Sequence, residues 1–265
     1  MSQDISRILK DWDYDPEQIG ARIVRGDDDR EKIQLRVELG VLQMEMDGRP
    51  DGSRPESFES WLDYEEQQLR LYDASHPEGP AFQLDEAQCM RLWREGVQYY
   101  HRYVAFWHLE QYERCARDTA RTLRLFAFVR THAEQERHRV YFDQWRPYVT
   151  MMHARAVATP LLNNQGVDQA LQVIDSGIEA IQEFLDDYGQ SERARECAEL
   201  ISLERWRDEV LRSGQAASPQ LKIRALRQRL DEAVAAEEFE EAARLRDEIR
   251  RLGEEIRPAR NPGDE

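Results

Sequence analysis

The sequence lacks the features of several large protein classes. It contains no apolar run of about 18 residues, the length that a membrane-spanning helix needs, so we expect no membrane segment. The first residues, MSQDISRILKDWDYD, are acidic and have no apolar core, so we expect no secretion signal. The three cysteines, Cys89, Cys115 and Cys197, are far apart, and their odd number predicts neither a disulfide framework nor a zinc site. We therefore expect a cytoplasmic protein of bacterial type.

The sequence also lacks the short motifs of common active sites. It has no HExxH zinc motif, no CxxC pair, no glycine-rich phosphate loop and no GxSxG turn. His132 and His138 lie in a polar run with Glu134 and Glu136, which is typical of a solvated helix face. We predict a protein that is not an enzyme and has no catalytic residue, metal or cofactor.

One arrangement would favour an enzyme instead. His101 and His108 are about two turns apart on a helix, too far for the usual one-turn metal pair. A deep pocket holding at least two of His101, Tyr103, His108 and Glu110 would nevertheless indicate a catalytic site that the motifs do not show.

Positive charge is scarce in the chain as a whole. The net charge of −16 opposes binding to nucleic-acid phosphates, so we expect no direct contact with nucleic acid. Basic side chains outnumber acidic ones only in the middle, in residues 91–155. Two interpretations are open for this segment. It is either a docking face for an acidic partner or a set of charges that pair with acidic neighbours inside the fold.

Strand patterns are confined to the N-terminal part. Residues 21–25 are apolar and β-prone, Gly26 begins an aspartate-rich turn, and residues 33–39 alternate between apolar and polar. The alternation changes phase at Gly40, which predicts a bulge or a sharp bend. Residues 47–52 then form a loop. The pattern predicts a small antiparallel hairpin or three-stranded sheet in residues 1–55.

Helical periodicity dominates residues 56–212. The pattern predicts a helix from Ser57 to Tyr72, and then one that Asp85 and Gln88 begin with a capping box. Further helices follow, with a kink at Pro147 and a cap at Gly189. The chain is thus predicted to be mainly α, with an irregular helical bundle or a degenerate helical repeat that loosely resembles tetratricopeptide hairpins.

Aromatic residues form a stripe along one predicted helix of this domain. Trp93, Tyr100 and Trp107 recur at helical spacing on one face. Such a stripe is typical of a plain core, and the alternative is a groove that binds a peptide.

The C-terminal part is the most regular. A polar linker at 213–218 precedes residues 219–257, where Ser218 and Pro219 fit the start of a helix. Two apolar stripes at helical spacing are separated near Glu237–Glu238, which predicts a helical hairpin, and residues 258–265 are predicted to be a flexible tail. A unit this small has little core of its own and therefore a reason to bind a partner. The stripes contain Ile223, Leu226, Leu230, Ala233, Val234, Phe239, Ala242, Ala243, Leu245, Ile249 and Leu252.

The run from Phe239 to Ile249, FEEAARLRDEI, resembles the UVR motif of excinuclease subunits B and C. The resemblance covers about residues 219–255 and leaves the rest unassigned. It implies a helical hairpin, coiled-coil-like in its packing, that binds another protein, often through a second hairpin of the same kind. We therefore expect partner binding by Leu226, Leu230, Phe239, Ala242, Leu245, Arg246, Asp247 and Ile249.

Three functions compete at this stage. The first is a protein–protein interaction adaptor or scaffold whose hairpin docks a partner protein or a second copy. The second, suggested by the resemblance, is an accessory role in nucleotide-excision DNA repair. The third is an enzyme with a site in the helical middle.

Overall fold

The computed structural model describes residues 4–164, 166–215, 226–227, 229–231, 233–234 and 238–256. After a short helix α1 (Ser6–Lys10), three strands form an antiparallel sheet in the order β1-β2-β3. They are β1 (Ala21–Arg25), β2 (Glu31–Val37) and β3 (Gly40–Glu45). The predicted three-stranded sheet is confirmed.

The phase change at Gly40 has a different cause from the predicted bulge. Val37 pairs with Gly40, so Glu38 and Leu39 form a tight hairpin turn between β2 and β3. Leu39 consequently lies at the tip of the turn and is 88% exposed. A two-residue turn restarts the alternation just as a bulge does, which is why the sequence does not distinguish the two.

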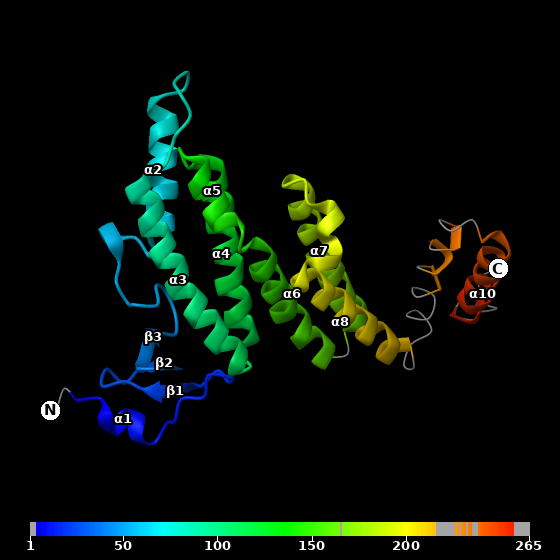
Figure 1. Ribbon diagram of the computed structural model, residues 1–265, viewed down its shortest axis with the longest axis horizontal. Helices are drawn as coiled ribbons and strands as arrows, with labels where there is room; N and C mark the ends of the chain where they lie inside the picture. The colour runs from blue at the N-terminus through cyan, green and yellow to red at the C-terminus, as the bar shows by residue number, and fades with distance from the viewer. Residues whose placement is uncertain are drawn as a thin grey trace, which may run out of the picture.

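The body is helical. Its elements are η1 (Pro55–Ser57), α2 (Trp61–Ser75), α3 (Glu86–His108), α4 (Tyr112–His132), α5 (Glu136–Asp143), α6 (Arg146–Asn163), α7 (Val167–Asp187), η2 (Ser191–Glu196) and α8 (Ala198–Gln215). In Figure 1, α3, α4, α6, α7 and α8 follow one another from left to right. Each of these helices packs on the next. The mainly α fold is confirmed, and it is a serial array of helices.

Several predicted boundaries move for identifiable reasons. Helix α2 begins at Trp61 rather than Ser57, because Ser60 caps it and Ser57 has a positive φ of 69°. At Pro147 the predicted kink is a break between α5 and α6, with the proline in the first turn of α6. Helix α8 continues to Gln215, past the predicted end at 212, and the hydroxyl of Ser213 donates to the carbonyl of Val210 at 3.0 Å.

Other local signals are confirmed as predicted. Asp85 and Gln88 form a reciprocal capping box at the start of α3. Gly189, with φ of +62°, follows the end of α7, and the N–H of Gln190 donates to the carbonyl of Leu185.

Three apolar clusters hold the body together. The sheet packs through Ile33 and Met44 against the end of α3 around Phe106. A second cluster joins α2, α3, α4 and α5, and a third joins α6, α7 and α8 around Ile174 and Leu203. No helix in the described part of the chain has the length and apolar character needed to cross a membrane.

Candidate functional site

The C-terminal hairpin has a small apolar core of its own. Helix α10 (Phe239–Ile256) packs against the helical residues that precede it. The N–H of Glu238 donates to the carbonyl of Ala233 at 2.8 Å, and Arg229 forms an ion pair with Glu241 at 3.1 Å. The buried core residues are Leu226, Ala233, Ala242 and Leu245, with Leu230 and Ile249 packed against them.

The residues predicted to bind a partner therefore divide into two groups. The first group packs together inside the hairpin and consists of Leu226, Leu230, Ala242, Leu245 and Ile249. The remaining residues are on its surface: the Phe239 side chain is 70% exposed, and Arg246 and Asp247 are exposed on α10.

Two large apolar side chains of the hairpin are exposed. Val234 is 53% exposed and Phe239 is 70% exposed, and they lie on either side of the connection between the helices. Val234 belongs to the predicted apolar stripe but was not among the residues expected to bind a partner. Apolar side chains that the fold leaves exposed are candidates for contact with a partner.

The hairpin core is separate from the cores of the body. Within the described residues, its apolar cluster contains side chains of the hairpin alone. Figure 1 shows α10 at the right, away from the end of α8. Several predicted features lie outside the described residues. They are residues 216–218 of the linker, which include Ser218, then Pro219 and the tail at 258–265.

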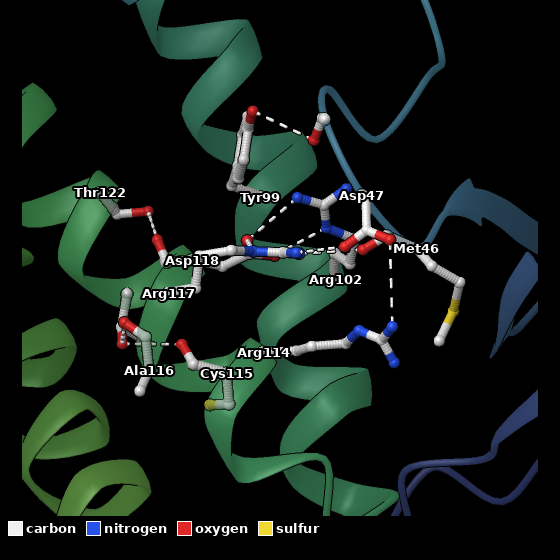
Figure 2. Close-up of polar contacts among 12 residues, drawn as sticks. Met46, Asp47, Tyr99, Arg102, Arg114, Cys115, Ala116, Arg117, Asp118 and Thr122 are labelled. Atoms are coloured by element: carbon white, nitrogen blue, oxygen red, sulfur yellow. Dashed lines mark hydrogen bonds and ion pairs between the residues drawn. The ribbon is translucent and has the colours of Figure 1, made fainter.

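The basic middle contains a buried ion pair. Arg102 on α3 donates two hydrogen bonds to Asp118 on α4, at 2.6 and 3.0 Å, and each side chain is 1% exposed. Arg102 also donates to the carbonyl of Glu45 at the end of β3. Arg117 contacts Asp118 and Asp47, as Figure 2 shows, so the network fastens the end of the sheet to two helices.

Most other arginines of residues 91–155 are also paired internally. Arg121 pairs with the fully buried Glu95, and Arg124 pairs with Asp63 at 2.7 Å. Arg146 on α6 pairs with Asp187 at 2.9 Å. These pairs, some within the segment and some with flanking residues, support the interpretation that its charges pair with acidic neighbours inside the fold.

An apolar cavity of about 410 Å³ lies between α3, α4 and the α5–α6 segment. Trp93 and Tyr100 of the predicted aromatic stripe line it, whereas Trp107 packs against Tyr112 instead. Sequence patterns do not reveal the cavity, because its lining comes from four helices. The one available signal is a glycine, Gly96, inside the aromatic stripe.

The cavity brings together two of the residues named as markers of an enzyme. His101 and Tyr103 both line it, whereas His108 and Glu110 do not. Burial lowers the pKa of His101, so its ring is neutral near pH 7. No lining residue carries a carboxylate or a thiol that would orient or activate a catalytic group. The cavity thus holds two of the four residues, as the enzyme hypothesis requires, and an enzyme with a site in the helical middle stays a hypothesis.

Two of the three cysteines are buried and have weakly acidic thiols. Cys89 and Cys115 are buried in apolar clusters, and burial raises the pKa of these thiols to about 11 and about 12. Among the described residues, no group of three or more His, Cys, Asp or Glu is placed to hold a metal ion. In the aspartate-rich turn, Asp28 pairs with Lys32 and Asp29 with Arg25.

The site best defined by geometry is thus a small helical hairpin with two exposed apolar residues, Val234 and Phe239. Residues 220–255 match the family model of the UvrB/uvrC motif, abbreviated UVR. This motif is found in DNA-repair proteins and mediates protein interactions, and its match confirms the resemblance drawn from the sequence. No curated protein and no solved structure matches the chain.

Proposed function

We propose that this chain is a non-enzymatic adaptor that binds a partner protein through its C-terminal hairpin. The observation that carries the proposal is the UVR match at residues 220–255 on a hairpin whose core is separate from those of the body. A unit of about 40 residues gains little stability from its own core, so a partner that covers its apolar surface stabilises it further.

The exposed residues suggest how the hairpin docks. Phe239 and Val234 provide the apolar contact, because their side chains are already on the surface and need no rearrangement. Arg246 and Asp247 lie beyond them on α10 and set the orientation through charge at the rim of the interface. Leu226, Ala242 and Leu245 act indirectly, by holding the two helices together.

The partner is a protein, and a second hairpin of the same kind has the appropriate chemistry. Two such hairpins placed together would cover each other's exposed apolar residues in a helix-to-helix contact. A cytoplasmic location is part of the proposal. Self-association is distinguished from a foreign partner by measuring the mass of the purified chain with light scattering over a range of concentrations.

An accessory role in nucleotide-excision DNA repair is the alternative. It is favoured by the occurrence of the motif in DNA-repair proteins. The net charge of −16 favours contact with a repair protein over contact with DNA itself. A gel-shift titration over increasing salt tests this, because binding to phosphates weakens steeply with salt.

The experiment that tests the main proposal is affinity capture from the native host. The full chain and a form lacking residues 219–257 serve as baits, and mass spectrometry identifies the captured proteins. The proposal predicts a protein that is retained by the full chain and absent with the shortened form. Equal capture by both baits would contradict it, and a captured set of excision-repair proteins would support the alternative.

A further inference from the structure

The cavity in the helical body offers a second binding site, independent of the hairpin. Its volume of about 410 Å³ falls within the range of roughly 300–1,000 Å³ that is usual for small-molecule sites. Its walls are α3, α4 and the segment from Phe142 on α5 to Val149 on α6. It is distinct from the arginine network, which lies around Arg102 and Asp118.

The cavity has a buried floor and an open aromatic rim. Leu125 and Phe142 on the floor are 0% and 1% exposed. At the rim, Tyr100 and Trp145 are 43% and 49% exposed, so large ring faces are accessible from solvent. Aromatic rings that remain exposed at the mouth of a buried apolar space favour the entry of another flat, apolar group.

Gly96 keeps one wall of this cavity open. It lies inside α3, where glycine destabilises a helix by about 1 kcal/mol relative to alanine. Packing does not require it, because the nearest contact of an added Cβ would be Leu125 Cδ2 at 4.0 Å. Gly177 in α7 differs, since a Cβ there would meet the Cβ of Ala154 at 2.9 Å. The absence of a side chain at Gly96 is therefore explained by the open space beside it.

Polar side chains are present in the lining of the cavity. Tyr103 lines the cavity and its side chain is 2% exposed, so its hydroxyl belongs to the buried part of the wall. A tyrosine hydroxyl in the wall of a cavity can donate a hydrogen bond to a polar atom of a ligand and so favour its binding. Tyr148 and His101 also line the cavity. Burial raises the pKa of Tyr148 to about 12, so its hydroxyl is protonated and able to donate at neutral pH.

The lining determines the class of ligand. No aspartate, glutamate, lysine or arginine lines the cavity, so nothing there would compensate a buried charge. Most of its lining lies on helices, whose interior backbone groups are already hydrogen-bonded, so a peptide main chain would find few partners. We propose that the cavity binds a small, uncharged aromatic molecule with a hydrogen-bonding group, of the phenol or indole class, whose polar atom contacts Tyr103.

Ligand-observed NMR with the full chain tests this proposal. Indole is the probe, and indole-3-acetate, tetramethylammonium and N-acetyl-tryptophanamide are the comparison compounds for an anion, a cation and a peptide-borne ring. The proposal predicts saturation transfer to indole, at least tenfold weaker binding of the two ions, and no preference for the peptide analogue. Stronger binding of tetramethylammonium or of N-acetyl-tryptophanamide than of indole would overturn it.

Two substitutions test whether indole binds in the cavity. Gly96→Leu fills the space and is expected to weaken indole binding at least tenfold, while Ala127→Leu, which adds the same side chain to an exposed position of α4, leaves it unchanged. Tyr103→Phe removes one oxygen atom and is expected to weaken binding about fivefold, the loss of one hydrogen bond. Unchanged affinity in either cavity variant would contradict the proposal, and Tyr103→Phe decides the question if Gly96→Leu does not fold.

Discussion

At the scale of single residues, the most consequential contact is the ion pair between Arg102 and Asp118. Both side chains are 1% exposed, and their two hydrogen bonds satisfy groups that would otherwise be buried without a partner. Arg102 also lies against the rings of Tyr99 and Phe106. The pair connects the sheet to α3 and α4, so its loss is expected to affect the whole N-terminal half.

We expect Arg102→Met to lower the free energy of unfolding by about 3 kcal/mol, because the buried Asp118 carboxylate loses two of its charged hydrogen bonds and keeps only the contact with Arg117 at 3.0 Å. Urea denaturation followed by circular dichroism measures this loss. The double variant Arg102→Met with Asp118→Leu should recover most of it, since no buried charge then remains. A loss below about 1 kcal/mol for the single variant would show that Asp118 finds other compensation.

Residue-scale patterns also show which parts of the fold could be predicted. The capping box of Asp85 and Gln88 involves two residues close in sequence, so the sequence alone identifies it. The start of α2 combines the local cap of Ser60 with a distant contact, because the carboxylate of Glu95 accepts hydrogen bonds from the N–H groups of Trp61 and Leu62. That contact comes from a different helix, and no local pattern indicates it.

At the scale of elements, the hairpin is the unit on which the proposed function depends. Leu245 is 3% exposed and occupies the middle of its small core with Leu226 and Ala242. In a core of so few residues, each large side chain contributes a substantial part of the stability. Phe239 begins the same helix but remains exposed, so the two residues have separable roles.

Leu245→Ala is therefore expected to unfold the hairpin locally, at a cost of about 2–5 kcal/mol for a buried leucine. Hydrogen exchange measured by mass spectrometry should show lost protection in residues 238–256 and unchanged protection in α3 to α8. Phe239→Ala, at an exposed position of the same helix, is the matched control and should leave protection in α10 unchanged. Equal loss of protection in both variants would contradict this division.

The sequence predicted the apolar stripes of the hairpin but did not show which partner they contact. Periodicity identifies the buried face of a helix, and it is the same whether that face is covered by the other helix or by another molecule. The cavity could not be predicted from the sequence, because its lining residues come together only when helices pack. Trp93, Leu125 and Tyr148, for example, belong to three different helices. The sheet, by contrast, follows from the alternation of adjacent strands.

At the scale of the whole molecule, we expect stability to depend on pH through two half-buried histidines. Burial lowers the pKa of both His101 and His153 below the ordinary value of 6.5. The unfolded chain therefore binds protons that the folded chain excludes as the pH falls through 6.5. The contribution of these groups is present above that pH and is lost below it.

We expect the urea midpoint to be lower at pH 5 than at pH 7.5. Replacing both histidines with glutamine should reduce this difference, because the variant has no imidazoles to protonate. Denaturation of the wild type and the double variant at the two pH values provides the comparison. A pH dependence that is the same in both proteins would show that other groups cause it.

We propose that the two parts of the molecule have separate roles: the body folds by itself, and the hairpin binds a partner. The most direct test is affinity capture from the native host with the full chain carrying Phe239→Ala and Leu245→Ala together. The account predicts that the captured protein is lost while circular dichroism shows a folded body, and that Leu39→Ala, an exposed apolar residue of the sheet, retains it. Retention of the partner by the double variant would contradict the account.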